Sequence, residues 1–218
     1  MQQSIANDDA GLWRFEGGAE LYAKRLRAFT TTDLSAEEIH NIGLREVARI
    51  EQQMDGLLRE IGYDNGSIIE RVNQLRAALS YPDTVEGRTL IMSDIQEFLA
   101  DALLRTGNSF DIRPEAEVIA QPYPEFRWTS AAASYSGPPA DGSRPGIFQM
   151  PLRASRLTQF GLRSLVYHET VPGHHFQIAL SVENTELPAF RQIRALGGLS
   201  ANSEGWGLYA ERFAAEDG

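Results

Sequence analysis

Apolar side chains recur at helical spacing through the first half of the chain. Between residues 39 and 61 they alternate at intervals of three and four residues, which is typical of a helix with one apolar face. Ser35 and Glu38 form a capping box at the start of this helix, and Gly62 is expected to follow its end. Further helices are predicted over residues 20–29, 67–79 and 86–105.

The middle of the chain differs in composition, because seven of the ten prolines lie between Pro114 and Pro151. Short strands are predicted over residues 117–119, 125–129 and 147–150, and a helix over residues 157–170. The sequence therefore predicts a mainly α protein with a small β-sheet (α+β). We see no clear linker and expect a single domain over residues 1–218, with a helical part (1–113) and a part that holds the strands and later helices (114–218).

Composition argues against several classes of protein. The formal net charge is −10 and the isoelectric point is near 4.9, whereas nucleic-acid binding requires a basic face. No apolar stretch approaches the roughly 18 residues that span a bilayer, and the first residues lack the charged start and apolar core of a signal peptide. The chain has no cysteine, so strong metal ligands must be His, Asp or Glu.

Three of the four histidines lie in the stretch 168–175. A Glu directly after a ligand His is an arrangement that zinc hydrolases use, but their second His usually follows four residues after the first, where this chain has Pro172. On a straight helix His174 would lie about 120° around the axis from His168, and His175 would lie roughly 10.5 Å along it. Because proline interrupts helical hydrogen bonding and the following glycine tolerates unusual dihedral angles, we expect a kink or bulge that brings His174 near His168.

A second acidic motif begins at Glu204, 36 residues after His168. Glu204 and Glu211 are seven residues apart and would share one face of a helix. Zinc peptidases of the glutamate-ligand type take their third ligand from a later helix, so one glutamate could bind metal while the other orients a ligand histidine. An ordinary explanation also exists: surface histidines beside a Pro-Gly turn, and glutamates that face water.

Together these motifs resemble the bacterial family catalogued as domain-of-unknown-function family 885. Its hallmark is His-Glu-x-x-Pro-Gly-His-His-x-Gln, which here spans residues 168–177, and the likeness extends to the segments 34–40, 43–50, 141–146 and 204–211. The resemblance covers nearly the whole chain. Members usually run to several hundred residues, so we expect this chain to be an internal fragment, truncated at both ends, whose exposed apolar surface favours self-association.

The family is grouped by similarity with zinc peptidases of the glutamate-ligand type. Position by position, the resemblance implies His168, His174 and Glu204 as zinc ligands and Glu169 as general base. His175 competes with His174 for the ligand role, and the resemblance does not settle which of the two binds.

The expected function is zinc-dependent hydrolysis of a peptide or another amide. Three protein ligands would leave one position on Zn²⁺ for water, whose proton Glu169 would take and return to the leaving amine. His175 and Tyr209 are candidate donors to the developing oxyanion, and Glu211 is the candidate partner of a ligand histidine.

Substrate binding is assigned to an edge strand over residues 146–150, which includes Phe148 and would hold the substrate backbone beside the metal helix. Arg144, in the loop before it, would pair with a substrate carboxylate. Two alternatives remain open: a strand that only closes the sheet and a structural Arg144 salt bridge. The rival function is a non-catalytic helical binding or scaffold fragment of a larger protein, with or without bound metal.

Overall fold

The computed structural model describes residues 11–192 and 198–216. Contacts divide the chain into two compact units, Met1–Val72 and Asn73–Gly218. The boundary falls inside helix α3 (Ile68–Leu79), where no run of proline or glycine marks it. The composition of the chain therefore gives no sign of this division.

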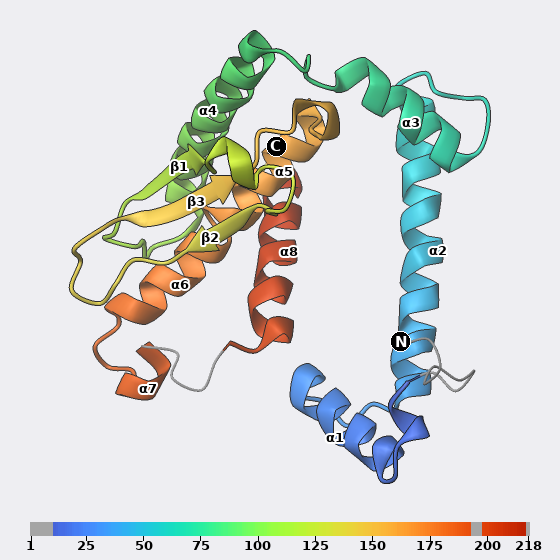
Figure 1. The fold of residues 1–218 in the computed structure, drawn as a ribbon, viewed down its shortest axis with the longest axis vertical. Coiled ribbons are helices and arrows are strands. Elements are labelled where there is room, and N and C mark those ends of the chain that lie inside the picture. Colours follow the sequence, from blue (N-terminus) through green and yellow to red (C-terminus); the bar gives the residue numbers. More distant parts are fainter. Residues whose placement is uncertain (1–10, 193–197, 217–218) are drawn as a thin grey trace, which may run out of the picture. The chain divides into compact units, whose positions relative to one another are not determined.

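Unit 1 is helical in its described part. A 3-10 turn (Leu12–Arg14) precedes α1 (Gly18–Thr30), and α2 (Ala36–Glu60) leads to the start of α3 (Figure 1). The predicted capping box is present at the start of α2. The Ser35 hydroxyl accepts the backbone N–H of Glu38 at 3.2 Å, and the Glu38 carboxylate accepts the backbone N–H of Ser35 at 2.8 Å. The three helices predicted for this region are confirmed, with small shifts of their ends.

A buried cation ties α2 to α3 within unit 1. The Arg71 side chain is 3% exposed, and its guanidinium donates to the Asp55 carboxylate and to the carbonyl of Tyr63. Arg59 donates to the same carboxylate at 2.9 Å. Because hydrogen bonds from Arg59 and Arg71 favour the charged form, they lower the pKa of Asp55 to about 2.

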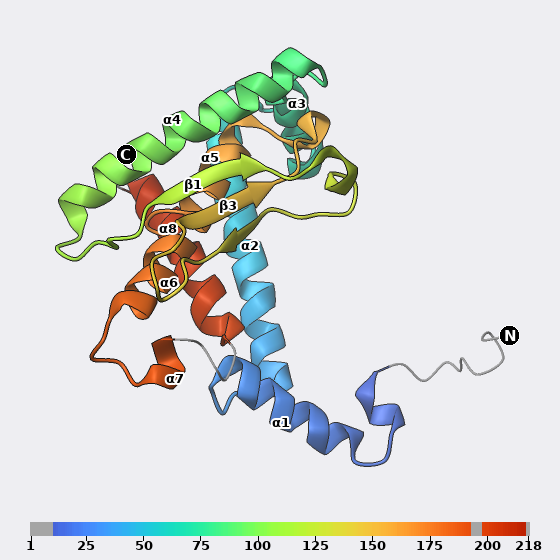
Figure 2. The same cartoon turned by 60° about the vertical axis from the view of Figure 1, so that its left-hand side comes forward.

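Unit 2 combines a small sheet with helices, as Figures 1 and 2 show. Its elements are α4 (Val85–Ser109), β1 (Val118–Pro122), a 3-10 turn (Glu125–Arg127), β2 (Ser134–Ser136), β3 (Gly146–Met150), a second 3-10 turn (Ala154–Arg156), α5 (Gln159–Glu169), α6 (His174–Glu183), α7 (Ala189–Gln192) and α8 (Ser200–Glu216). The helix predicted over 86–105 is α4, and the helix predicted over 157–170 is α5. The mainly α fold with a small sheet is therefore confirmed.

The sheet has the strand order β1-β3-β2, with β1 parallel and β2 antiparallel to β3. The prediction that residues 146–150 form an edge strand is wrong, because β3 is the central strand of this sheet. The edge on the other side of β3 from β1 is the short strand β2, in which Tyr135 pairs with Phe148. The strand predicted over 125–129 is also wrong, since Glu125–Arg127 forms a 3-10 turn.

The core of unit 2 lies between α4, the sheet and α5. Alternate residues of β3 face this core, because side chains alternate between the two faces of a strand. The contributing side chains are Ile91, Ile95 and Leu99 of α4, Phe148 and Met150 of β3, and Leu162 and Val166 of α5.

Polar contacts also hold α5 against α4. The Asp101 carboxylate on α4 accepts hydrogen bonds from Arg163 and from the Tyr167 hydroxyl, each at 2.9 Å, and from Arg105 at 2.9 Å. Tyr167 is 1% exposed and directly precedes the first histidine of the motif. The C-terminal end of α5 is thus fixed by both apolar packing and a carboxylate with several donors.

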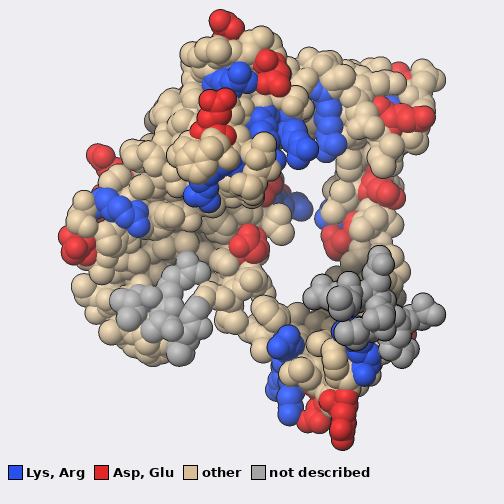
Figure 3. Space-filling model, in the orientation of Figure 1, with Lys and Arg blue, Asp and Glu red and all other residues tan. Residues whose placement is uncertain are grey.

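Acidic and basic side chains both occur on the face drawn in Figure 3. Some ion pairs form within a single helix: Lys24 pairs with Glu20 in α1, and Arg212 pairs with Glu216 in α8. Among the helices of the described residues, none combines the length and apolar character needed to cross a bilayer.

Candidate metal centre

The histidine motif forms a break between two helices. His168 and Glu169 end α5, α6 begins at His174, and the turn between them contains a cis Val171–Pro172 peptide bond. The sequence analysis expected one kinked helix, whereas the structure has two. Gly173 is required in this turn, because a Cβ atom there would overlap the carbonyl oxygens of Tyr167 and His168.

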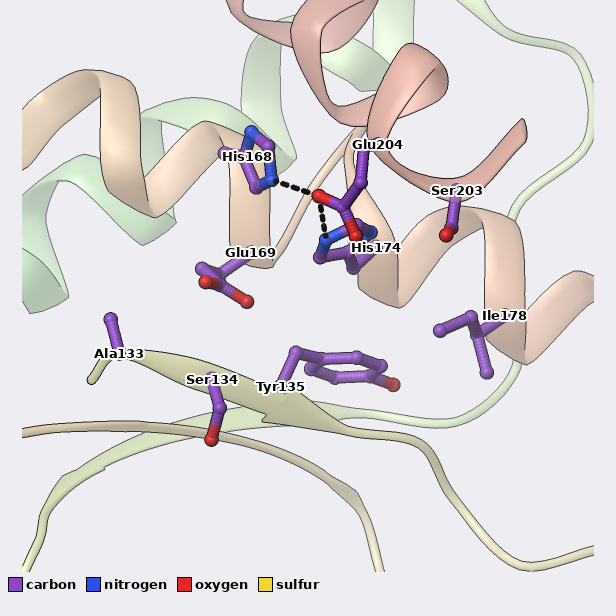
Figure 4. A pocket seen from close by; sticks show the side chains of 9 residues that line it. All are labelled: Ala133, Ser134, Tyr135, His168, Glu169, His174, Ile178, Ser203 and Glu204. Carbon is purple, nitrogen blue, oxygen red and sulfur yellow. Dashed lines mark ion pairs between the residues drawn. The ribbon is translucent and has the colours of Figure 1, made fainter. Parts of the chain in front are cut away.

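This turn brings His174 against His168, as expected. The two imidazole rings meet edge to face, with centroids 4.7 Å apart. The α8 helix adds Glu204, whose Oε2 lies 3.4 Å from Nε2 of His168 and 3.6 Å from Nε2 of His174. Figure 4 shows the carboxylate pointing at both rings.

The three donor atoms suit a tetrahedral zinc site. One ligand atom from each of His168, His174 and Glu204 lies within 4.8 Å of the others. For ligands about 2.0–2.1 Å from Zn²⁺ in tetrahedral geometry, neighbouring donor atoms are roughly 3.3–3.4 Å apart. The His–Glu separations are close to that value, and two imidazoles with one carboxylate are a ligand set that catalytic zinc sites use. Metal binding by these residues is still a prediction.

Glu211 orients His168 from the next turns of α8. Its carboxylate accepts a hydrogen bond from Nδ1 of His168 at 2.7 Å. In the neutral ring the proton is then on Nδ1, which leaves the lone pair of Nε2 toward Glu204 and His174. The same hydrogen bond raises the pKa of His168.

Gly207 lets α8 approach α5 at the site. A Cβ atom at Gly207 would lie 2.5 Å from Cε1 and 2.7 Å from Nε2 of His168, both too close for an ordinary contact. Any larger residue would therefore push the imidazole away from Glu204. In contrast, a Cβ atom at Gly205 would meet nothing within 4 Å.

Glu169 faces a cavity of about 360 Å³ beside the cluster. It is 7% exposed, and burial raises the pKa of its carboxyl group; His168 opposes this shift and Glu204 adds to it. The cavity lies between β2 on one side and the side chains of His168, His174 and Glu204 on the other (Figure 4). Its lining consists of Ala133, Ser134, Tyr135, His168, Glu169, His174, Ile178, Ser203 and Glu204.

Comparisons with known proteins place the whole chain in a family. The family described as "Bacterial protein of unknown function (DUF885)" matches residues 2–218. The chain belongs to this family. No curated protein matches the chain.

A crystal structure of a protein from Colwellia psychrerythraea, described as a "putative lipoprotein", is similar in fold, with a TM-score of 0.91 and 36% sequence identity. The match covers 99% of this chain and 37% of that protein. The chain therefore spans little more than a third of the length of this relative.

In the present chain His175 directly follows His174 but does not join the cluster of His168, His174 and Glu204. It is 2% exposed; its Nε2 donates to the carbonyl of Ala116 at 3.0 Å, and its Nδ1 accepts from the Tyr135 hydroxyl at 2.8 Å. The carbonyl can only accept, so it fixes the tautomer and makes Tyr135 the donor. Burial lowers the pKa of His175 and raises that of Tyr135. With both ring nitrogens engaged, His175 is placed as a structural residue between α6, β2 and the segment before β1.

The other sequence-predicted residues also lie away from the cavity. Tyr209 is 51% exposed on α8 and contacts Trp206 and Phe213. Phe148 is 0% exposed, because its position on β3 points into the core. Arg144 lies in an exposed loop, donates to the carbonyl of Pro145, and lines a different cavity beside α6.

Sequence reasoning missed five residues of the cavity wall, namely Ala133, Ser134, Tyr135, Ile178 and Ser203. Ile178 follows His174 by four residues, a spacing that places it on the same face of α6. Ser203 directly precedes Glu204, so its position was also accessible from the motif. Ser134 and Tyr135 belong to a strand of three residues, which is too short to give a periodic signal.

Proposed function

We propose that this chain forms the metal-binding part of a zinc-dependent hydrolase that cleaves peptide bonds. The observation that carries the proposal is the convergence of His168, His174 and Glu204 on one cavity that Glu169 also faces. When bound there, Zn²⁺ would supply a Lewis acid that polarises a substrate carbonyl and acidifies water.

Glu169 is the general base in this proposal. Its carboxylate lies on the cavity wall, and burial raises its pKa toward the range in which a carboxylate accepts a proton efficiently near neutral pH. It would take a proton from the attacking water at a carboxylate oxygen and transfer it to the leaving amine.

The edge strand β2 gives the reason for choosing a peptide substrate. Ser134 and Tyr135 line the cavity, and within the described residues β2 pairs with a strand on one side only, which is β3. An extended peptide could pair with the other side through main-chain hydrogen bonds and place a carbonyl between the cluster and Glu169. In this proposal β2 takes the role that the sequence analysis assigned to residues 146–150.

Zinc stoichiometry tests the ligand set. Elemental analysis of protein dialysed against Zn²⁺ should find one zinc per chain in the wild type and none in His168→Ala or Glu204→Ala. His40→Ala is the matched control, because His40 lies on α2 in unit 1. Full zinc in either ligand variant would refute the assignment.

Hydrolysis tests the reaction. Glu169→Gln should keep its zinc but lose cleavage of a fluorogenic peptide library, because an amide has a similar shape and cannot accept the proton. Glu186→Gln, in the exposed segment after α6, is the control. If the wild type binds zinc but cleaves no peptide, even in a longer gene product, the non-catalytic binding alternative replaces this proposal.

A further inference from the structure

The position of Glu204 depends on how α8 is held. The Glu204 side chain is 59% exposed, and it points at histidines that belong to α5 and α6. Surface exposure gives a carboxylate little support from packing, so the place of its helical turn decides whether it meets the two imidazoles. The contact that fixes this turn therefore affects the whole cluster.

Trp206 makes that contact. Its indole Nε1–H donates to the carbonyl oxygen of Pro172 at 2.6 Å. Trp206 follows Glu204 by two residues, and Pro172 precedes His174 by two. The ring also stacks on Phe176 of α6, with centroids 6.5 Å apart and an interplanar angle of 11°. One side chain thus connects the turn that carries the carboxylate with the turn that joins the two histidine helices.

The carbonyl of Pro172, which accepts the hydrogen bond from Trp206, lies in a buried turn. Pro172 is among the fully buried residues of unit 2, and a buried carbonyl without a donor is costly. In the same turn the carbonyls of Thr170 and Gly173 accept the backbone N–H groups of Phe176 and Gln177, whereas the carbonyl of Pro172 accepts the indole N–H of Trp206. Moving α8 would therefore leave a buried acceptor unsatisfied, which makes one position of α8 strongly preferred.

We propose that Trp206 is a positioning residue for the metal centre, which sets Glu204 against His168 and His174 before metal binds. This inference rests on the proposed function. A side chain that is already held in its binding position loses less conformational entropy when metal binds. Loss of the indole N–H should therefore lower the affinity for metal more than it lowers the free energy of unfolding. A tryptophan that only packs would have the opposite effect.

Two matched variants separate these roles. Trp206→Phe keeps an aromatic ring near Phe176 but has no N–H donor. Trp128→Phe is the control, because Trp128 also lies in unit 2, donates to the carbonyl of Tyr123 at 2.7 Å, and does not line the cavity. Zinc affinity is measured by competition with a chromophoric chelator, and chemical denaturation of the metal-free proteins measures stability.

Trp206→Phe should bind zinc roughly three- to tenfold more weakly, the change expected from one hydrogen bond, while Trp128→Phe binds as the wild type does. In metal-free protein, amide hydrogen exchange of residues 203–207 should be faster in Trp206→Phe alone. Wild-type zinc affinity in Trp206→Phe, or an equal loss in Trp128→Phe, would overturn the inference.

Two further arms keep the test decisive. If Trp206→Phe fails to fold, 3-benzothienylalanine at position 206 replaces the N–H by sulfur in a ring of nearly the same shape; unchanged zinc affinity in that protein overturns the inference. If the wild type binds no zinc, the proposed function fails. The inference, which concerns a metal centre, then fails with it, whereas a wild type that binds zinc beside a Trp206→Phe variant of unchanged zinc affinity overturns the inference alone.

Discussion

The Nδ1–H of His168 donates to the carboxylate of Glu211 at 2.7 Å, which decides that Nε2 of the ring faces Glu204. Glu204 and Glu211, two turns apart on α8, therefore have different roles toward one imidazole. The first lies 3.4 Å from Nε2 and the second holds Nδ1. A single helix supplies both a candidate ligand and the group that prepares another ligand.

Glu211→Gln should weaken zinc binding on the order of tenfold, because the amide oxygen can still accept the proton of Nδ1 but no longer carries the charge that makes the imidazole more basic. Chelator competition would measure this. Glu216→Gln, which changes an exposed carboxylate paired with Arg212 on the same helix, is the control. Equal affinities in both variants would remove Glu211 from this role.

Gly207→Ala should lower zinc affinity by at least roughly tenfold, since the new methyl group displaces the His168 ring from Glu204. Gly205→Ala adds the same atom to the same helix, where it meets nothing within 4 Å. Both changes raise intrinsic helix propensity by about 1 kcal/mol, so a difference in zinc binding reports the contact with His168. Isothermal titration of the two variants is the measurement.

His174→Ala and His175→Ala should have opposite effects. The first removes a candidate ligand and should abolish stoichiometric zinc. The second should keep zinc but destabilise unit 2 by about 2–3 kcal/mol, because the Ala116 carbonyl and the Tyr135 hydroxyl lose buried partners. Elemental analysis and denaturant unfolding of both variants would check this, and zinc lost only from His175→Ala would reverse the two roles.

Unit 1 should lose stability in acid through Asp55. Its pKa is lowered to about 2 in the folded chain, from an ordinary value of 3.8. The folded state therefore binds this proton less tightly than the unfolded state. The stabilisation is complete above the unfolded pKa and is lost as pH falls through 3.8 toward about 2.

Asp55→Asn should be less stable than the wild type at neutral pH, and the difference should shrink as pH falls over that range. Hydrogen exchange of α2 and α3 at several pH values would follow unit 1 specifically. Asp33→Asn, which changes an exposed partner of Arg27, is the comparison. A difference between Asp55→Asn and the wild type that does not vary with pH would contradict the role given to Asp55.

Much of the fold and the ligand cluster could be predicted from local signals. Apolar spacing and the Ser35–Glu38 capping box indicate helices because they are properties of a few neighbouring residues. The approach of His174 to His168 followed from what proline and glycine do to a helix. These features need no knowledge of distant parts of the chain.

The sheet could not be predicted as well, because its order depends on contacts distant in sequence. Alternation in residues 146–150 indicates a strand, but it does not tell which neighbours the strand has or which face is buried. For this reason β3 was expected at the edge and Phe148 at the substrate. The adjacent residues His174 and His175 were hard to separate for a similar reason, since the partners of His175 lie 40 and 59 residues away.

Gly173 permits a comparison among genomes that needs no purified protein. Any side chain at this position would overlap the carbonyl oxygens of Tyr167 and His168, so the turn could not close in this form. A family member that keeps both histidines but has another residue here should be unable to bring them together in this way, even though its histidine motif looks intact. The residue at position 173 thus separates sequences that can form this turn from those that keep only the histidines of the motif.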